Sequence, residues 1–554
     1  MAVKTGAQII MEILQNEGVE YVFGLPGATE VLFLDALEKQ EKIKYILCLH
    51  ELVAMGAAEG YARTSGRAGV LNLHTHAGLL SSLGLLLNAY RGGVPLVITA
   101  GQADSRLLMQ EPHLSGPLAE TARLLTKWSA EISHIADIPI AVQRAFKTAL
   151  QPPTGPVFLS LPQDVLAQSL DYEYKSVTPV LSMIRPDTDA LYRAMDLLMN
   201  ARKPAIVVAE GVAKNKAQRE VVKLAELVGA PVYQMWMADV NFPTQHPQYL
   251  GELSAPSAPM RKALQGIDTL VVIGCQLFEH VRYDPAPLLD AGTSLIHIDD
   301  NPWEIAKNYP VTVGMQGHIR ESVAELVNLL AKKMSPPDNK AAQKRIEEIS
   351  RQKAEKNAAL MRQAQAEGND VPVSVSRFSL ELKKALPAGT RLVDDAWSSS
   401  DLMRQFLDLK EPGEFQRSRR GGAIGYGMPG AIGVKLAAPA SPVVSVCGDG
   451  SAIWSIQSLW TAAHYYLPIT YIILANKSYH TARLRWLETI SGKLSDRHHS
   501  LELDNPVLDF CRMAQGMGVN ARRVTRPDEL GKVLQEALES GKTELVEVDT
   551  KPYP

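Results

Sequence analysis

Two short polar segments near the C-terminal end of the chain combine ligands for a metal ion with groups that bind phosphate. Residues 448–451 read Gly-Asp-Gly-Ser, and residues 476–478, Asn-Lys-Ser, begin 27 residues after Asp449. The Asp449 carboxylate, the Asn476 amide oxygen and the backbone carbonyl of Ser478 are hard oxygen ligands, which suit Mg²⁺. Backbone N–H groups of a turn and a helix start can bind phosphate oxygens. The two segments therefore predict a site for Mg²⁺ and a diphosphate.

The elements around these segments should bring them together. Residues 443–446 and 469–474 are apolar runs typical of buried strands, and residues 451–460 have helical spacing between them. Asp449 and Asn476 would then follow the carboxyl ends of two strands, where open α/β sheets bind ligands. The alternative is a structural strand–helix–strand unit with an ordinary Asx turn.

A candidate catalytic carboxylate lies in the N-terminal part of the chain. Residues 43–49 read as a buried strand, and apolar residues with helical spacing follow His50 and Glu51. Glu51 would therefore stand at a helix start, directly after a strand. In isolation, a first-turn carboxylate that stabilises the helix dipole explains it equally well.

Together, these segments resemble the thiamine-diphosphate enzymes. The Gly-Asp-Gly turn with a later Asn resembles their Mg²⁺–diphosphate signature, and residues 50–63 look like the segment that carries their essential carboxylate. The resemblance implies thiamine diphosphate and Mg²⁺ as cofactors. It implies that Glu51 is hydrogen-bonded to the aminopyrimidine ring and relays a proton. The implied metal ligands are Asp449, Asn476 and Ser478.

The resemblance also implies further contacts with the cofactor. Residues 422–429 resemble the loop that cradles the aminopyrimidine, and Ile424 takes the place of the bulky apolar residue that keeps the cofactor bent; a core Ile is the alternative. Two serines after the strand-like residues 391–393 resemble diphosphate-binding hydroxyls, although a helix N-cap would also explain them. The implied cofactor-binding residues are Pro26, Gly27, Ser398, Ser399, Gly422, Ile424, Gly450, Ser451 and Tyr479.

Within this family, the chain is most similar to benzoylformate decarboxylases. The phrases that carry the likeness are residues 22–27, 72–74, 97–102, 126–129, 458–463 and 508–510. His74 falls where these enzymes place an active-site histidine after a strand, and His76 is a weaker companion. An imidazole can relay protons near neutral pH. The alternative for both is a packed or solvated loop histidine.

The chain departs from the benzoylformate decarboxylase pattern at two positions. Ala28 stands where these enzymes have a serine, and their second active-site histidine aligns with Val281. His280 lies one residue away and is a candidate replacement. The catalytic candidates are Glu51, His74, His76 and His280.

Clustered arginines mark two further segments. Arg417, Arg419 and Arg420 precede the aminopyrimidine loop, and Arg483 and Arg485 follow the proposed metal ligands. They form either a solvated basic surface or a pocket for a substrate with an extra anionic group, because guanidinium groups suit carboxylate and phosphate.

Alternation of short β runs with helical stretches predicts parallel α/β structure throughout. With the resemblance, it predicts three doubly wound parallel-sheet domains. The expected divisions are an N-terminal pyrimidine-binding domain at 1–180, a middle domain at 181–335, a charged helical connector at 336–371 and a C-terminal Mg²⁺–diphosphate domain at 372–554.

Composition limits the other functions of this 554-residue chain. A formal charge of −3 gives no reason to expect nucleic acid as a partner. No apolar run approaches 18 residues, and four cysteines without metal-ligand spacing favour reduced thiols. We therefore expect a cytoplasmic protein that does not bind membranes.

These observations predict an enzyme that decarboxylates a 2-oxo acid without oxidation and can join the product to an aldehyde, giving a 2-hydroxy ketone. The alternative is a carboligase or lyase similar to acetolactate synthase or benzaldehyde lyase. A nicotinamide dehydrogenase lacks support because no strand-linked G-x-G-x-x-G is present, and a non-catalytic protein would not need Glu51, Asp449 and Asn476. The resemblance implies a homodimer at least, and commonly a homotetramer.

Overall fold

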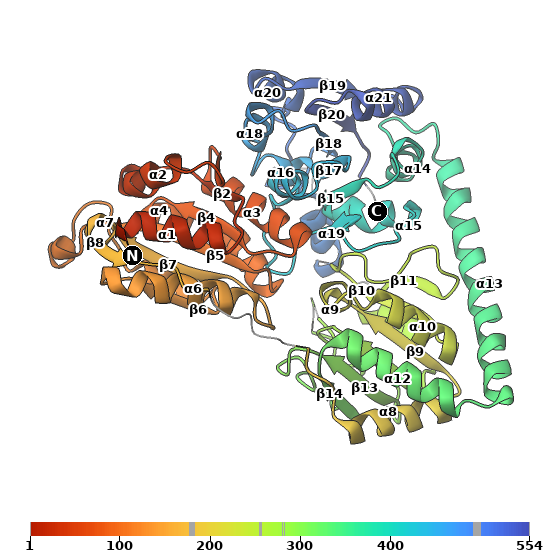
Figure 1. Ribbon diagram of the computed structural model, residues 1–554. Coiled ribbons are helices and arrows are strands. Elements are labelled where there is room, and N and C mark those ends of the chain that lie inside the picture. Colours follow the sequence, from red (N-terminus) through yellow and green to blue (C-terminus); the bar gives the residue numbers. More distant parts are fainter. Residues whose placement is uncertain are drawn as a thin grey trace. The chain divides into compact units, whose positions relative to one another are not determined.

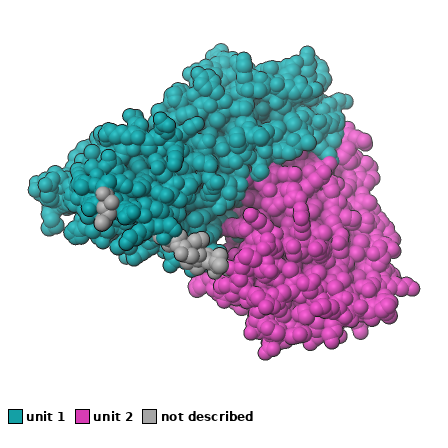
Figure 2. Space-filling view, in the orientation of Figure 1, with its two compact units in different colours: residues 1–180, 369–403, 417–554 teal, residues 181–368, 404–416 magenta. Residues whose placement is uncertain are grey.

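The computed structural model describes residues 2–176, 183–253, 257–279, 281, 283–490 and 500–552. The chain forms two compact units (Figure 2). One comprises residues 1–180, 369–403 and 417–554, and the other comprises residues 181–368 and 404–416. The units contain three separate large α/β sheets. The predicted fold class, three doubly wound parallel-sheet domains, is confirmed.

The first sheet has the strand order β3-β2-β4-β5-β7-β6, and all its pairings are parallel. Its strands β4, β5 and β7 are buried on both faces, as is usual for parallel sheets. Helices α1 and α6 pack with one face and α3 and α4 with the other (Figure 1). The strands are β2 Tyr21–Gly24, β3 Lys44–Leu47, β4 Gly69–Leu73, β5 Leu96–Gln102, β6 Trp128–Glu131 and β7 Val157–Pro162; β1 Ala2–Thr5 and β8 Ser169–Tyr172 form a separate antiparallel pair.

The helices of this part alternate with the strands. They are α1 Gly6–Asn16, η1 Ala28–Glu30, α2 Val31–Glu38, α3 Glu51–Ser65, α4 Thr75–Arg91, η2 Ser105–Gln110, α5 Leu118–Arg123, η3 Ile135–Asp137, α6 Ile138–Leu150 and α7 Gln163–Ala167. Local chemistry sets the ends of α3. The Nδ1 atom of His50 accepts a 3.0 Å hydrogen bond from the backbone N–H of Leu52, and Gly66 closes the helix with a φ of 72°.

The second sheet lies in the other unit and has the order β11-β10-β9-β12-β13-β14, again with parallel pairings. Its strands are β9 Pro204–Val208, β10 Val232–Met235, β11 Tyr249–Leu253, β12 Thr269–Ile273, β13 Ser294–Asp299 and β14 Val313–Gln316. Its helices are α8 Thr188–Asn200, α9 Glu210–Lys214, α10 Gln218–Val228, α11 Ser257–Leu264 and α12 Ile319–Lys333.

The charged segment after this sheet is helical, as its composition predicted. Helix α13 Pro336–Ala366 spans 31 residues and begins with a capping box between Ser335 and Asp338. The Lys353 ammonium donates to the backbone carbonyls of Thr244 and His246 at 2.5 and 2.7 Å. Lys353 therefore ties the middle of the helix to the unit that contains the second sheet.

The third sheet contains β15-β17-β18-β20-β19 in that order, and these pairings are parallel. The strands are β15 Arg391–Asp395, β17 Val443–Gly448, β18 Ile469–Ala475, β19 Asn520–Val524 and β20 Glu544–Asp549; β16 is Phe415–Gln416. The helices are α14 Val375–Ala385, η4 Trp397–Ser399, α15 Ser400–Phe406, α16 Gly427–Ala437, α17 Asp449–Ala452, α18 Ser458–His464, α19 His480–Thr489, α20 Phe510–Gly516 and α21 Pro527–Glu539.

One expected helix differs from the structure. Residues 451–460 were expected to form a single helix, but α17 ends at Ala452 and α18 begins at Ser458. Between them the backbone N–H groups of Trp454 and Ser455 bond to the third preceding carbonyl, at 3.2 and 3.1 Å, so the chain is wound more tightly than an α-helix.

Helices α3 and α16 touch at the level of the backbone. A Cβ on Gly60 would lie 2.2 Å from the Gly430 carbonyl oxygen, and a Cβ on Gly433 would lie 1.9 Å from the Ala57 carbonyl oxygen. Only glycine permits such an approach. The two helices share one buried core with both neighbouring sheets. No helix in the described part of the chain is long and apolar enough to cross a membrane.

Candidate active site

Three neighbouring strands of the third sheet end at the same edge. β15, β17 and β18 are adjacent and parallel, and they end at Asp395, Gly448 and Ala475. The residues predicted to bind the cofactor follow directly: η4 with its two serines after β15, Asp449 after β17 and Asn476 after β18. The sheet thus places the two halves of the predicted signature side by side, at the edge where open α/β sheets bind ligands.

The Asp449 carboxylate is buried and bonded to backbone groups. Its Oδ1 accepts a hydrogen bond from the N–H of Gly450 at 2.8 Å, and its Oδ2 accepts one from the N–H of Lys477 at 2.6 Å. Burial raises the pKa of Asp449 to about 6, although these N–H groups act in the opposite direction. A divalent cation would offset the cost of the buried charge, so the group fits a metal ligand.

The other predicted ligands lie in the turn after β18. The Asn476 Oδ1 accepts from the backbone N–H of Ser478 at 3.0 Å, and Ser478 is buried. Tyr479 packs against Gly450, where a Cβ would lie 2.7 Å from its ring. Together with the Asp449 carboxylate, the amide and carbonyl oxygens of this turn are a donor set that suits Mg²⁺, so the residues present fit the implied metal.

Ser398 and Ser399 belong to the short helix η4, which lies next to β17 and α19. Ser399 is buried and Ser398 is half-buried. Ser451 is buried in the first turn of α17, beside Gly450. The predicted diphosphate-binding residues are therefore on elements that meet at one edge of the sheet.

Asp395, which is not among the residues predicted from the sequence, holds the loop before α16. Its Oδ2 accepts from the N–H groups of Gly425 and Gly427 at 2.9 and 3.2 Å, and its Oδ1 accepts from the Trp397 indole N–H at 2.8 Å. Burial raises the pKa of Asp395 to about 6. The available signal was an acidic residue at the end of a strand, 30 residues before the glycines of the loop.

This loop has a backbone that favours glycine. Gly422 and Gly425 have φ values of 82° and 97°. Asn88 of α4 fixes the loop from the other side, since its side-chain amide donates to the Ala423 carbonyl at 2.9 Å. Ile424 lies between these anchors and is half-buried, which suits a side chain presented to a ligand.

Glu51 is the first residue of α3, as expected, and it is only 9% exposed. Gly78 of α4 lies against it: a Cβ on Gly78 would come within 3.2 Å of the Glu51 Oε1. Glu51 is thus a carboxylate confined between two helices.

His74 stands between β4 and α4, and its ring nitrogen Nδ1 lies 2.8 Å from the Glu30 Oε2 and 3.3 Å from the Thr29 Oγ1. Gly27 packs directly against this imidazole and donates its N–H to Glu30 at 3.1 Å. Pro26 and Ala28 beside it are exposed. Gly27 therefore contacts the histidine, and the cofactor contact expected of Pro26 and Gly27 stays a prediction.

His76 has a different neighbourhood. Its Nε2 lies 3.0 Å from the Thr121 hydroxyl, and its ring packs against Gly116. Gly116 belongs to the wall of a pocket of about 360 Å³, which also contains the carboxylates Glu111, Glu120 and Glu131. Like charges would repel a 2-oxo acid from this wall, so His74 is the better candidate.

The candidate His280 lies outside the described residues. Val281, which the resemblance aligns with the family's second histidine, is 46% exposed. It supplies no group that could transfer a proton.

Two of the three arginines before the loop form internal ion pairs. Arg419 is buried and contacts Asp394 at 2.8 Å, and Arg417 is buried and contacts Asp401 at 3.3 Å. A solvated surface is therefore wrong for these two, and their guanidinium groups already have carboxylate partners. Arg483 and Arg485 pair with acidic neighbours at 2.8 and 3.1 Å, namely Glu502 and Glu488.

Three non-glycine residues with left-handed backbone stand next to predicted site residues. Thr75 follows His74 with a φ of 45°, Trp397 precedes Ser398 with a φ of 42°, and Lys477 follows Asn476 with a φ of 58°. Such conformations cost free energy and often accompany functional sites. Their positions support the choice of these segments.

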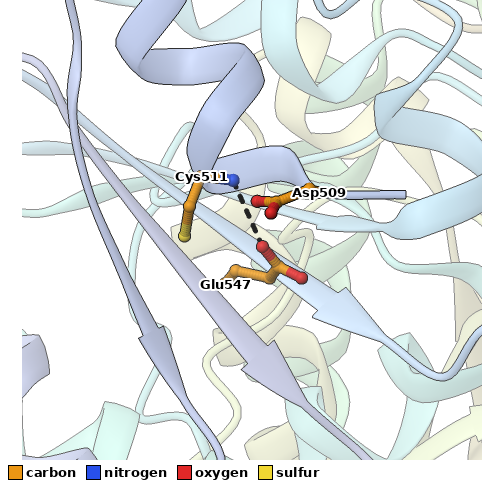
Figure 3. Close-up of side chains that lie close together, drawn as sticks. All are labelled: Asp509, Cys511 and Glu547. Atoms are coloured by element: carbon orange, nitrogen blue, oxygen red, sulfur yellow. Dashed lines mark hydrogen bonds between the residues drawn. The ribbon is translucent and has the colours of Figure 1, made fainter. Parts of the chain in front are cut away.

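A further cluster, Asp509, Cys511 and Glu547, lies on α20 and β20 (Figure 3). Arg523 contacts the Asp509 Oδ1 at 3.0 Å and the Glu547 Oε2 at 3.1 Å. Burial and nearby carboxylate charge raise the pKa of the Cys511 thiol to about 12, so it is protonated at neutral pH. We interpret the cluster as a structural ion-pair network.

Comparison with known proteins identifies the family. Models of the thiamine pyrophosphate enzymes match residues 4–117 (N-terminal TPP binding domain), 191–326 (central domain) and 398–548 (C-terminal TPP binding domain). A benzoylformate decarboxylase from Pseudomonas aeruginosa is 32% identical over 99% of both chains. The chain belongs to the thiamine pyrophosphate enzyme family. Thiamine pyrophosphate is another name for thiamine diphosphate.

Other members of the family are similar over the full length. The acetolactate synthase large subunit of Haemophilus influenzae is 29% identical over 98% of this chain and 94% of its own. The structure of a 4-hydroxybenzoylformate decarboxylase from Rhodococcus jostii has a TM-score of 0.86 and 28% identity over 99% of both chains. The chain is therefore a thiamine-diphosphate enzyme of the 2-oxo acid decarboxylase and carboligase group, as the sequence predicted.

Proposed function

We propose that this enzyme removes CO₂ from a 2-oxo acid without oxidation and either releases an aldehyde or joins the product to a second carbonyl compound. The observation that carries the proposal is the position of Asp449 and Asn476 at the ends of adjacent strands β17 and β18. Full-length similarity to a benzoylformate decarboxylase supports the choice of a 2-oxo acid as substrate.

The proposed cofactor site uses residues whose geometry fits it. Asp449, Asn476 and the carbonyl of Ser478 would hold Mg²⁺. Gly450, Ser451, Ser398, Ser399 and Tyr479 would surround the diphosphate, and Gly422 and Ile424 would support the aminopyrimidine. When bound, thiamine diphosphate supplies a nucleophilic carbon and accepts the electron pair released with CO₂.

The side chains around it would manage protons. Glu51, confined between α3 and α4, would hold a proton at the aminopyrimidine. His74 would give a proton to the carbon that has lost CO₂ or take one from a substrate hydroxyl. His76 and His280 are secondary candidates for the same task.

A panel of aromatic and aliphatic 2-oxo acids tests the proposal. Purified enzyme with Mg²⁺ and thiamine diphosphate is incubated with each acid, with and without an added aldehyde. CO₂ and hydroxy ketone are measured separately. We expect CO₂ release from at least one acid only when both cofactors are present. Absence of CO₂ and hydroxy ketone across the panel would contradict the proposal.

A carboligase or lyase similar to acetolactate synthase or benzaldehyde lyase is the second candidate. Ala28 and Val281 favour it, because each replaces a polar group that benzoylformate decarboxylases are expected to have. The same panel separates the two. Hydroxy ketone in a 1:1 ratio to CO₂ without added aldehyde, or cleavage of a hydroxy ketone, would indicate the second candidate.

The proposal includes assembly, location and domain limits. We propose a homodimer at least, and a homotetramer by resemblance, which light scattering would test. Buried free thiols such as Cys48 and Cys447 are typical of a cytoplasmic protein. Limited proteolysis would test domain limits at residues 1–180, 181–335, 336–371 and 372–554.

A further inference from the structure

A fully buried carboxylate lies behind the candidate catalytic histidine. Glu30 is the last residue of η1, and its side chain has no exposed surface. Its Oε1 accepts hydrogen bonds from the Thr29 hydroxyl at 2.7 Å and from the Gly101 N–H at 3.0 Å. Its Oε2 accepts from the Gly27 N–H at 3.1 Å and contacts the His74 Nδ1 at 2.8 Å. Four donors therefore satisfy one buried charge.

These bonds determine which imidazole nitrogen carries a proton. An ionised carboxylate can only accept, so the Nδ1 of His74 must donate to Glu30. The Thr29 hydroxyl already gives its hydrogen to Glu30, so at 3.3 Å from Nδ1 it can also act only as an acceptor. With Nδ1 protonated, Nε2 is left to exchange a proton with a substrate. No hydrogen bond of Nε2 is found among the described residues.

Two glycines make room for this pair. A Cβ on Gly27 would lie 1.9 Å from the His74 Nδ1, and a Cβ on Gly101 would lie 2.2 Å from the Glu30 Oε1. The backbone of Gly27 has φ −130° and ψ −173°, which any residue can adopt. Glycine at position 27 is therefore required by the close approach of the imidazole and not by the backbone conformation.

His76 provides an internal comparison. The Thr121 hydroxyl, 3.0 Å from its Nε2, donates its hydrogen to the Pro117 carbonyl at 2.9 Å, so it can only accept from the ring. This neutral contact favours the proton on Nε2 of His76, whereas the Glu30 carboxylate places it on Nδ1 of His74. The buried acid is associated with one of the two candidate histidines only.

We propose that Glu30 is the positioning residue for His74: it holds the proton on Nδ1 and orients Nε2 toward the substrate. The inference rests on the proposed function. In the step concerned, the Nε2–H bond of protonated His74 breaks and a C–H bond forms at the carbon that has lost CO₂. The imidazole becomes neutral and recovers its proton from solvent. Carboxylate–imidazole pairs act in this way in other enzymes, where loss of the tautomer lowers turnover severely.

Glu30→Gln tests the inference. The amide is similar in size but can face Nδ1 with its NH₂ group, so the tautomer is no longer fixed. We expect ¹⁵N NMR of the histidines, recorded without cofactor, to show Nδ1–H in the wild type and a mixture of tautomers in the variant, with His76 signals unchanged. Turnover should fall roughly 100-fold or more with KM within about threefold. Cofactor retention should be unchanged.

Two further variants complete the test. Asp164→Asn is the control, because this half-buried carboxylate of the same part of the chain binds Ser105 and no histidine; it should leave spectra and turnover unchanged. Gly27→Ala retains both Glu30 and His74 but displaces the ring, and should also lose the fixed tautomer. If Glu30→Gln does not fold, the NMR spectrum of Gly27→Ala decides: a His74 tautomer that stays fixed in this variant would overturn the inference.

The outcomes separate the inference from the function. A wild-type enzyme without activity on any 2-oxo acid but with the fixed tautomer would reject the proposed function and retain the Glu30–His74 pair. An unchanged His74 tautomer in Glu30→Gln, or unchanged turnover in an active enzyme, would overturn the role of Glu30.

Discussion

Asp449 directly follows β17, and it accepts a 2.6 Å hydrogen bond from the backbone N–H of Lys477, which lies just after β18. The bond links the two sequence segments that predict the metal site. Lys477 has a φ of 58°, so the turn is held in a strained conformation at this point.

Asp449→Ala should abolish retention of thiamine diphosphate. The change removes a charged ligand from Mg²⁺ and a hydrogen-bond acceptor from the turn. We expect the dissociation constant for the cofactor to rise more than about 100-fold, since even partners of metal ligands contribute 10–100-fold. Mass spectrometry of the purified protein and titration with Mg²⁺ would measure this. Wild-type retention would show that the Gly-Asp-Gly turn has another role.

Glu51→Gln should bind the cofactor but activate it poorly. An amide cannot transfer a proton to the aminopyrimidine as a carboxyl group does, so exchange of the cofactor's C2 proton should slow roughly 100-fold or more. Acid-quenched NMR measures this exchange. Glu59→Gln is unsuitable as a control because Glu59 pairs with Arg63 inside the same helix. Glu120→Gln in α5 serves instead. Exchange at the wild-type rate in Glu51→Gln would remove Glu51 from the mechanism.

His74→Ala should lose turnover without losing the cofactor. By resemblance, Val281 aligns with the family's second histidine, so we expect proton delivery after loss of CO₂ to depend on His74, and we expect substantial carboligation beside aldehyde release in the wild type. The variant should turn over roughly 100-fold more slowly. Quantifying aldehyde and hydroxy ketone in one reaction provides the measurement. If rate and product ratio are unchanged, His76, His280 and His480 are the next residues to replace.

Asp395→Asn should loosen the loop that presents Ile424. The carboxylate Oδ2 accepts from both Gly425 and Gly427, and an amide that keeps these bonds turns its NH₂ toward the Trp397 indole N–H. We expect a loss of about 1–3 kcal/mol in unfolding free energy and weaker cofactor binding. Thermal unfolding and cofactor titration test both effects. Asp528→Asn, at an exposed carboxylate of α21, is the control; equal effects in the two variants would contradict a role specific to the loop.

His297 should make the unit with the second sheet sensitive to acid. Burial lowers its pKa to about 4, and its Nε2 lies 3.0 Å from the Cys275 carbonyl. The folded pKa is below the unfolded value, so this stability is complete above about pH 6.5 and is lost as pH falls toward 4. Between pH 7.5 and 5 the unfolding free energy of this unit should fall by about 2 kcal/mol because of His297. The His297→Gln variant should not show this acid-dependent loss of unfolding free energy, as measured by urea-dependent hydrogen exchange of residues 294–299. An equal loss in the variant and the wild type would contradict the assignment to His297.

Features whose residues lie close together along the chain could be predicted from the sequence. Asp449 and Asn476 follow apolar runs within 30 residues of each other, so their meeting at one sheet edge could be inferred. Glu30 and Asp395 could not be assigned in this way, because each accepts hydrogen bonds from groups far away in the sequence. Gly101, for example, donates to Glu30 across 71 residues. An acid three residues after a loop glycine was the available signal.

Charge clusters were misleading for the same reason. Arg417 and Arg419 looked like a basic surface because their carboxylate partners, Asp401 and Asp394, precede them by 16 and 25 residues. A sequence shows that charges are close along the chain but not which of them are neutralised in the fold.

The glycine contact between α3 and α16 also affects how this protein could be recombined with its relatives. Glu51 begins α3, and the loop that presents Ile424 leads into α16, so the spacing between these two helix ends is set by peptide atoms at Gly60, Gly430 and Gly433. A chimera that takes the two helices from different parents must keep small residues on both sides of the contact. Crossovers that leave the pair intact can exchange the remaining helices without altering that spacing.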